Sequence, residues 1–130
     1  MVPLPPFVRG DIWFADLSTG AQGREIFKSR PVVIIANPVI IRQGGSPIAV
    51  VPISDATTKL LSDAPVLRLP NQHVLIPGDA LSGLDKLSVA MCEQIRAVDR
   101  GRFQYRKGKV DSNQLEQIAE AMTFTLDLFL

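Results

Sequence analysis

This chain of 130 residues contains few of the side chains that bind metals or form disulfides. Its single cysteine, Cys92, cannot form a disulfide within the chain or a cysteine-rich metal site. Its single histidine, His73, argues against a histidine-based metal site. We therefore expect no metal and no cofactor, and we interpret Cys92 as a packed strand thiol and His73 as an ordinary core or surface residue.

The sequence also lacks an apolar stretch of membrane-spanning length. Pro3, Pro5 and Pro6 interrupt the short apolar run at the N-terminus, which has no basic segment and is therefore unlike a signal peptide. Disorder is disfavoured as well, because 46% of the residues are hydrophobic. These properties predict one domain, residues 1–130, in a cytoplasmic protein with no membrane partner.

Charge of one sign is not in excess, since the net charge is only +1. The distribution is uneven, because residues 96–109 contain six basic side chains and one acid, whereas residues 111–130 contain four acids and no base. A net charge of +1 does not by itself indicate a nucleic-acid partner. The basic stretch can supply phosphate contacts, and a solvated face is the alternative interpretation.

Short apolar segments separated by turn residues predict a mostly β protein. The expected strands are residues 12–17, 30–37, 48–53, 66–69 and 87–95. Trp13 and Phe14 in the first strand are interpreted as core side chains and not as a stacking platform, and Pro52 predicts a bulge or a sheet edge. Residues 74–83 are expected to form a loop, and residues 98–105 a short helix or turn.

A helix is expected at the C-terminal end of the chain. Asp111 is placed to cap it, and Gln114 three residues later completes a capping-box spacing. Apolar side chains follow at helical spacing on one face: Leu115, Ile118, Ala119, Met122, Leu126 and Phe129. The stripe must pack on the sheet or on a second subunit, and we expect a homodimer. Strands and helix together predict a small, mostly antiparallel barrel plus one helix.

A charged loop leads directly into an apolar strand at residues 23–37. The loop delivers Arg24, Lys28 and Arg30, with Glu25 among them, to one end of the strand. Arg holds phosphate oxygens through paired hydrogen bonds, so cations at the mouth of a rigid strand suit a phosphate-bearing ligand.

Four motifs occur in a defined order before the terminal helix. They are Gly10-Asp11-Ile12-Trp13, Gly23-x-Glu25-x-x-Lys28-x-Arg30-Pro31-Val32-Val33, Val51-Pro52-Ile53-Ser54 and Cys92-Glu93-Gln94-Ile95-Arg96-Ala97-Val98-Asp99. In this order, from Gly10 to Leu128, the chain resembles the MazF/PemK toxins of bacterial toxin–antitoxin systems.

The resemblance implies a fold and an activity. The fold is a small, partly open antiparallel barrel of the CcdB/PemK-like (Src-homology-3-like) type that forms homodimers. The activity is that of a metal-independent endoribonuclease, which cuts single-stranded RNA at short sequences through attack of the 2′-hydroxyl. A cognate antitoxin binds the same surface and blocks it.

The resemblance also identifies Arg30 and Ser54 as catalytic residues. In the family, the residue at Arg30 lines the RNA groove and stabilises charge on the scissile phosphate, which a fixed guanidinium does without proton transfer. Ser54 stands where related sequences often have Thr, and its hydroxyl can donate to a phosphate oxygen; a local backbone bond is the alternative. Asp55 beside it is unusual, because a carboxylate repels phosphate.

Glu93 aligns with a carboxylate that some PemK-like members are proposed to use as a general base. The alternative is a structural Glu bonded to backbone or to Arg96. Two family side chains are replaced, since Met91 stands where the PemK-like subgroup has Arg and Arg24 stands where some members have His. The chain is therefore more similar to members that rely on the Arg and hydroxyl pair.

The remaining candidates are RNA-binding residues: Arg24, Glu25, Phe27, Lys28 and Gln94. Phe27 is an aromatic in a charged loop, so it is expected to stack on a base or contact the antitoxin. Gln94 can hydrogen-bond a base edge, with strand packing as its alternative. For Glu25 and Lys28 the alternative is a solvated ion pair.

Two other functions stay open at this point. The same barrel occurs in the CcdB toxin, which binds and poisons a topoisomerase without cutting a substrate, and the replaced Arg and His side chains leave this function available. A degenerate family member that only binds its antitoxin is the third hypothesis. Two assays distinguish the three hypotheses. An endoribonuclease cleaves RNA, a CcdB-like toxin inhibits DNA supercoiling, and a degenerate member does neither.

Overall fold

The computed structural model describes residues 7–18, 28–61 and 66–128. Most of the strands form one seven-stranded sheet, and two short strands form a separate hairpin. In these parts of the chain no helix has the length and apolarity needed to cross a membrane. The strands are β1 (Asp11–Asp16), β2 (Ser29–Ile34), β3 (Ile48–Asp55), β4 (Leu60–Leu61), β5 (Val66–Leu67), β6 (His73–Ile76), β7 (Ser88–Met91), β8 (Arg96–Val98) and β9 (Phe103–Lys109). The helices are α1 (Pro38–Gln43) and α2 (Ser112–Leu126), with short 3-10 helices η1 (Ala56–Thr58), η2 (Cys92–Gln94) and η3 (Arg100–Arg102).

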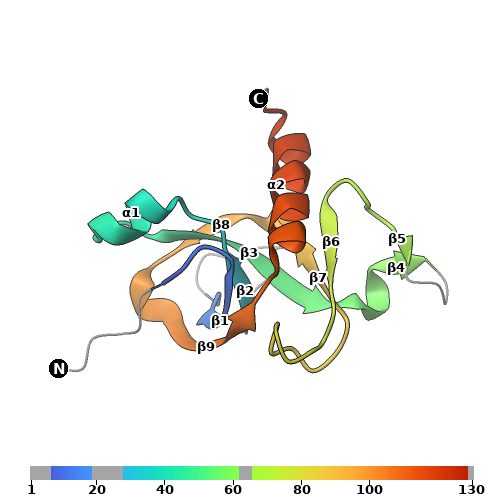
Figure 1. Ribbon diagram of the computed structural model, residues 1–130, viewed down its shortest axis with the longest axis horizontal. Helices are drawn as coiled ribbons and strands as arrows, with labels where there is room; N and C mark the ends of the chain where they lie inside the picture. The colour runs from blue at the N-terminus through green and yellow to red at the C-terminus, as the bar shows by residue number, and fades with distance from the viewer. Residues whose placement is uncertain (1–6, 19–27, 62–65, 129–130) are drawn as a thin grey trace.

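The large sheet is antiparallel and runs in the order β6-β7-β3-β2-β1-β9 (Figure 1). Its central strand, β3, changes partner along its length, because residues 48–50 pair with β8 and residues 53–55 with β7. Pro52 lies at this change of partner, opposite Val32 of β2. The two ends of the sheet, β6 and β9, do not pair with each other, so the sheet does not close into a barrel. This agrees with the partly open antiparallel barrel plus terminal helix expected from the sequence.

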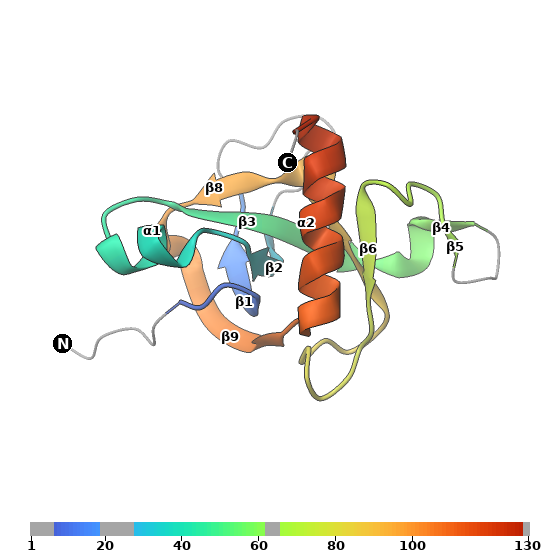
Figure 2. The ribbon, with the colours of Figure 1, turned by 45° about the horizontal axis from the view of Figure 1, so that its top comes forward.

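Apolar side chains pack on both faces of the sheet, as expected for strands whose successive side chains point to opposite sides. One cluster includes Ile12 and Val33 and is covered by α2 through Ile118. The other cluster includes Trp13 and is covered on the α1 side by Ile41. Figure 2 shows α2 lying across one face of the sheet, while α1 lies near its far end.

The terminal helix α2 begins as the sequence predicts. The Asp111 carboxylate accepts a hydrogen bond from the backbone N–H of Gln114, and the Gln114 side chain accepts one from the backbone N–H of Asp111. Ile118 is buried against the sheet. The apolar side chains at the end of the helix are instead exposed in a single subunit: Phe124, Leu126 and Leu128.

One local prediction is wrong, and two others have the wrong bounds. Residues 74–76 lie in strand β6 and not in a loop, because their pairing with β7 outweighs the turn signal of Pro77-Gly78 that follows. The segment 98–105 contains the short helix η3, as expected, but strand β9 begins inside it at Phe103, and the many charged side chains of β9 hide the strand pattern of a sheet edge. The strand expected over residues 87–95 ends at Met91 as β7, because η2 occupies residues 92–94 and the next strand, β8, begins only at Arg96.

Helix α1 was not predicted. The Asn37 side chain accepts a hydrogen bond from the backbone N–H of Val39, and Pro38 takes the first helical position. Pro suits that position because its missing N–H has no partner there in any case. Asn37-Pro38 therefore opens a helix as well as ending a strand.

Two glycines hold the loop between β6 and β7 against β9. A Cβ at Gly83 would lie 1.9 Å from the carbonyl oxygen of Lys107, and Gly83 also has a φ of +71°. A Cβ at Gly108 would lie 2.3 Å from the carbonyl oxygen of Leu81, which accepts a hydrogen bond from Lys109 N–H at 2.9 Å. This close approach brings the end of the loop alongside β9 and builds one wall of the site described next.

Candidate active site

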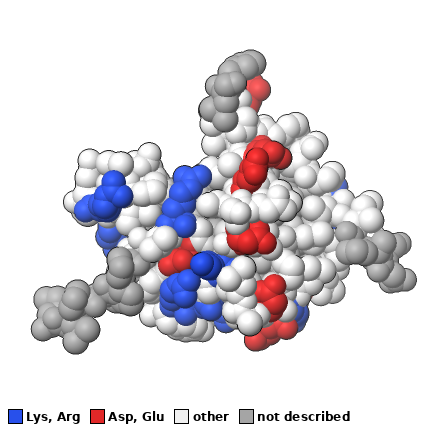
Figure 3. All heavy atoms as spheres, in the orientation of Figure 1, with Lys and Arg blue, Asp and Glu red and all other residues white. Residues whose placement is uncertain are grey.

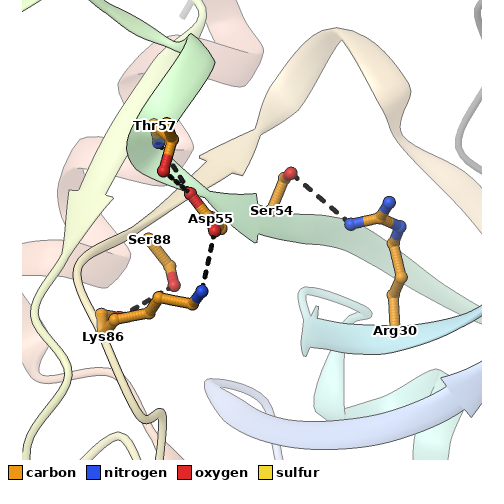
Figure 4. A network of polar contacts seen from close by, with 6 residues as sticks. All are labelled: Arg30, Ser54, Asp55, Thr57, Lys86 and Ser88. Atoms are coloured by element: carbon orange, nitrogen blue, oxygen red, sulfur yellow. Dashed lines mark hydrogen bonds and ion pairs between the residues drawn. The ribbon is translucent and has the colours of Figure 1, made fainter.

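The side chains of Arg30 and Ser54 meet at one end of the sheet (Figure 4). The β2–β3 register pairs Val32 with Pro52, and extending it by two residues places Arg30 opposite Ser54. Arg30 Nη1 donates a hydrogen bond to Ser54 Oγ at 3.4 Å. The structure therefore brings together the two side chains that the sequence predicts to act as a pair.

The Arg30 guanidinium makes only one long hydrogen bond to the described residues. Its bond to Ser54 lies beyond the usual range for an N–H···O hydrogen bond. Its Nε atom is buried and has no hydrogen-bond partner among the described residues. Because a guanidinium carries five N–H donors in a planar fork, Arg30 keeps donor capacity for an anionic ligand.

Arg30 lines a pocket of about 210 Å³, which we call the Arg30 pocket. The lining residues are Arg30, Pro31, Ile53, Ser54, Asp55, Leu84, Asp85, Lys86, Ser88 and Lys107. Three of them are cationic, and they come from β2, from the loop before β7 and from β9. Separate parts of the chain therefore bring three cations to a lining that also contains two acids, Asp55 and Asp85. The cations outnumber the acids, an arrangement suited to a phosphate group.

The Asp55 carboxylate is occupied by contacts of its own (Figure 4). Its Oδ1 accepts hydrogen bonds from the backbone N–H and the hydroxyl of Thr57, and its Oδ2 lies 3.0 Å from Lys86 Nζ. The Thr57 bonds first, and then Lys86, hold the pKa of Asp55 well below its usual range. The expected repulsion between Asp55 and a phosphate is thus offset by the ammonium group beside it.

Glu93 lies on η2 and is not among the residues that line the Arg30 pocket. Its Oε1 lies 2.9 Å from Nε2 of His73, whose side chain is only 3% exposed. His73 Nδ1 and Glu93 Oε2 are buried without hydrogen-bond partners among the described residues. The pair links the start of β6 to η2, and it makes His73 a core residue.

A second hollow, the His73 pocket, lies between β6 and α2 and has a volume of about 300 Å³. Its lining residues are Leu67, Pro70, Asn71, His73, Val74, Leu75, Gln117, Glu120, Ala121 and Phe124. This lining contains an acid but no Lys or Arg, so it lacks the cations that distinguish the Arg30 pocket.

The other predicted RNA-binding residues are not gathered into the Arg30 pocket. Lys28 is exposed just before β2, with a left-handed φ of +70°. Gln94 is partly buried on η2. Arg24, Glu25 and Phe27 lie outside the described residues.

The cysteine and the ionisable side chains show no metal-ligand arrangement in the described ranges. Cys92 is buried, and burial, with the charge of Glu93 second, raises the pKa of its thiol to about 12. It is the packed thiol that the sequence predicts. No group of three or more His, Cys, Asp or Glu side chains that could hold a metal ion occurs within residues 7–18, 28–61 and 66–128.

Sequence reasoning missed two cations of the Arg30 pocket, Lys86 and Lys107. Lys107 belongs to the basic stretch 96–109, which signalled phosphate contacts without indicating which side chain makes them. Lys86 had no such signal, because it is isolated in the sequence and reaches the pocket only through the docking of its loop on β9.

Opposite charges occupy separate parts of the surface, in agreement with the uneven sequence distribution. Figure 3 shows acidic side chains following α2 and basic side chains gathered beside it, toward α1. The acids of α2 are exposed at Glu116 and Glu120. Acidic and basic side chains therefore gather on different parts of this face of the molecule.

Comparison with known proteins agrees with this architecture. The family model described as PemK-like, MazF-like toxin of type II toxin–antitoxin system matches residues 8–126. Endoribonuclease EndoA of Bacillus subtilis is 35% identical over 120 residues, covering 92% of this chain and 94% of EndoA. Endoribonuclease MazF9 of Mycobacterium tuberculosis is 33% identical over 125 residues, covering 93% of this chain and 97% of MazF9.

Solved structures show the same fold. Mycobacterium tuberculosis toxin MazF-mt6 superimposes with a TM-score of 0.66 at 23% identity, covering 92% of this chain and 99% of that one. An endoribonuclease from Mycobacterial species, solved in complex with its cognate antitoxin, gives a TM-score of 0.64 at 18% identity, covering 95% of this chain and 97% of that one. Sequence, fold and family model agree, and the chain belongs to the PemK-like, MazF-like toxins of type II toxin–antitoxin systems.

Proposed function

We propose that this protein is a sequence-specific endoribonuclease toxin that cleaves single-stranded RNA without a metal ion. The observation that carries the proposal is the Arg30–Ser54 contact, 3.4 Å long, in a pocket that also contains Lys86 and Lys107. Two relatives more than 30% identical over nearly their whole length bear the name endoribonuclease, which supports the same activity.

Arg30 and Ser54 act on the scissile phosphate in this proposal. The ribose 2′-oxygen attacks phosphorus, a new P–O2′ bond forms and the P–O5′ bond breaks, leaving a 2′,3′-cyclic phosphate and a 5′-hydroxyl. The Arg30 guanidinium stabilises the negative charge that builds up on the phosphate oxygens, and the Ser54 hydroxyl donates to one of them. The 2′-proton passes to a base, and the departing 5′-oxygen takes up a proton.

Glu93 is the base that the family motif supports, but its surroundings support a structural role. Its carboxylate faces His73 and lies outside the lining of the Arg30 pocket. The variant Glu93→Gln separates the two roles, because an amide keeps a hydrogen-bond acceptor for His73 and cannot take a proton. A loss of cleavage of about 10²- to 10⁴-fold supports the base, whereas unchanged cleavage supports the structural role.

Sequence selection is proposed to involve the loop before β2 and the helix η2. Lys28 is exposed just before β2, and Gln94 lies on η2, between β7 and β8. Arg24, Glu25 and Phe27 precede Lys28 by a few residues in the sequence. Cations contact the backbone, while Gln94 and Phe27 bind bases through a hydrogen bond and through stacking.

A homodimer and a cognate antitoxin are the proposed partners, in the cytoplasm. The exposed Phe124, Leu126 and Leu128 at the end of α2 support dimerisation, since a monomer would leave this apolar group in water. One related structure is an endoribonuclease bound to its cognate antitoxin, which supports inhibition by such a partner. Sedimentation at micromolar concentration tests the dimer, and a monomer contradicts it.

The decisive experiment incubates purified protein with single-stranded RNA in the presence of a metal chelator. We expect cutting to continue and the products to carry 2′,3′-cyclic phosphate ends. The variant Arg30→Ala should lose cleavage, and the matched control Arg42→Ala, an exposed arginine of α1 outside the pocket, should retain it. Full cutting by Arg30→Ala contradicts the role of Arg30, and inhibition of DNA supercoiling without RNA cleavage contradicts the activity.

A further inference from the structure

Two aromatic side chains form a stacked pair across strands β1 and β9. Phe14 and Tyr105 are directly opposite in the β1–β9 register. Their ring centroids are 5.2 Å apart, and the ring planes differ by only 17°. Tyr105 is 51% exposed, whereas Trp13, the other aromatic side chain of β1, is 1% exposed. The pair therefore presents an aromatic surface to solvent and does not belong to the closed core.

This aromatic pair adjoins the Arg30 pocket. Lys107 lines that pocket, and its Nζ lies 5.9 Å from the Phe14 ring centroid and 5.8 Å from that of Tyr105. Pro31, another lining residue, lies opposite Phe14 in the β1–β2 register. One lysine and one strand pairing thus connect the aromatic surface to the phosphate-sized pocket.

Irregular pairing of β9 produces this arrangement. The register with β1 shifts between Ile12 and Trp13 and again between Phe14 and Ala15. The first shift leaves Lys107 as an extra residue between Arg106 and Gly108, and bulges of this kind redirect a side chain. Lys107 is consequently close to the rings of Phe14 and Tyr105 and also lines the Arg30 pocket.

Lys107 leaves a large part of this aromatic pair exposed. Its Nζ lies over both rings at nearly equal distances from their centroids, and Tyr105 is still 51% exposed. With half of Tyr105 exposed, another flat ring can stack there. Aromatic side chains next to cations that track a phosphate backbone are how proteins hold unpaired bases.

We propose that Tyr105 and Phe14, with Lys107, form a base-stacking platform for a nucleotide next to the phosphate held in the Arg30 pocket. The inference rests on the proposed action on RNA and assigns an unpaired nucleobase of the single strand as the occupant. Because every base has a π face, the platform adds affinity and positions the strand without selecting one base by itself.

Binding to non-cleavable probes tests the platform separately from cleavage. The probes are a mixed-sequence 2′-O-methyl RNA oligonucleotide and a second oligonucleotide of equal length with abasic residues. Wild type should prefer the base-bearing probe. The variant Tyr105→Leu should lose roughly 5- to 100-fold in affinity for that probe, equivalent to about 1–3 kcal/mol per stacked base, and should bind the abasic probe unchanged.

Matched variants separate stacking from charge and from folding. Tyr105→Phe keeps the ring and should bind as wild type does. Lys107→Gln should weaken binding of both probes and lower the salt dependence, whereas Lys109→Gln, an exposed lysine outside the Arg30 pocket, should have a smaller effect. Melting temperatures confirm that each variant is folded.

A direct observation comes from the single tyrosine of the chain. Selective labelling yields one tyrosine ring signal, which should move upfield when the base-bearing probe stacks on it and stay in place with the abasic probe. The platform is overturned by equal loss of both probes in Tyr105→Leu, by unchanged binding of both, or by an unmoved ring signal. Absence of RNA cleavage by wild type contradicts the proposed function alone, since these binding readouts do not require cleavage.

Discussion

The Arg30 pocket and the His73 pair both contain buried polar atoms without partners among the described residues, but their charged side chains make different contacts. In the first, Arg30 makes one long contact of 3.4 Å and retains a buried Nε without a partner among the described residues. In the second, His73 is almost fully buried and has Glu93 at 2.9 Å. An incompletely satisfied guanidinium in a cationic pocket is prepared for an anion, whereas a short buried pair holds two elements of the protein together.

The two regions also differ in how they are built. The Arg30 pocket collects cations from three distant segments, so its charge depends on the loop before β7 docking against β9. The His73 pocket lies between β6 and α2, and its wall contains no Lys or Arg. Chemistry is therefore expected to depend on the first region, and stability and assembly on the second.

The largest effect is expected for Arg30→Lys, which keeps the charge but removes the planar fork of donors. Cleavage should fall about 10²- to 10³-fold, because one ammonium cannot replace paired hydrogen bonds to the phosphate. Initial rates on a single-stranded RNA measure this. Arg42→Lys makes the same change on α1 outside the pocket and should leave the rate unchanged. Equal cleavage rates in wild type, Arg30→Lys and Arg42→Lys would contradict a special role for the Arg30 pocket.

Gly83→Ala should have the next largest effect. The new Cβ would collide with the Lys107 carbonyl and also adopt a left-handed φ, so the free energy of unfolding should fall by about 3 kcal/mol. Gly44→Ala is the matched control, since Gly44 has a φ of +72° and nothing within 4 Å; it should cost only about 1 kcal/mol. Denaturant titration measures both, and similar losses in the two variants would contradict the proposed docking of the loop.

Removing the carboxylate of the buried pair is expected to act on stability. Glu93→Ala leaves the His73 ring buried without its partner and should lower the free energy of unfolding by about 1–3 kcal/mol. Glu93→Gln keeps an acceptor for His73 and should recover most of that loss. Chemical denaturation of both variants and of wild type measures what the His73–Glu93 contact contributes to the free energy of unfolding. An unchanged value for Glu93→Ala would show that this contact does not hold β6 to η2.

The smallest effect is expected for Asp55→Asn, which weakens the exposed contact with Lys86. The pKa of Asp55 is lowered in the folded protein, so its stabilising effect is complete above the ordinary value of 3.8 and disappears as the pH falls through the folded value. Wild type should be slightly more stable than Asp55→Asn at pH 7. The difference should shrink in strongly acidic solution, and a difference that grows on acidification would contradict the assignment.

Local signals predicted the regular parts of the molecule. The capping box at Asp111 and Gln114 and the apolar spacing of α2 depend only on neighbouring residues, and both are present. The apolar core strands β1, β2 and β3 were located for the same reason. Strand β9 was missed because a charged edge strand is defined by its pairing with β1 and carries little apolar pattern of its own.

The candidate site was predicted in part. Arg30 and Ser54 came from motifs in separate strands, and the antiparallel register brings them together. Lys86 and Lys107 could not be assigned, because their positions result from the contact of Gly83 with β9 and from a bulge. The stacking of Phe14 on the exposed Tyr105 was hidden for the same reason, since it depends on which strand lies next to β1.

By itself, the order of residues in this chain determined the family, the mostly β architecture, the capped terminal helix and the arginine and serine of the site. Folding in three dimensions decided which lysines join that arginine, that Glu93 turns toward His73, and that two rings stack at the sheet edge. The physical reason is that capping and periodicity act between neighbours, whereas pockets form from side chains that only strand register and loop docking bring into contact.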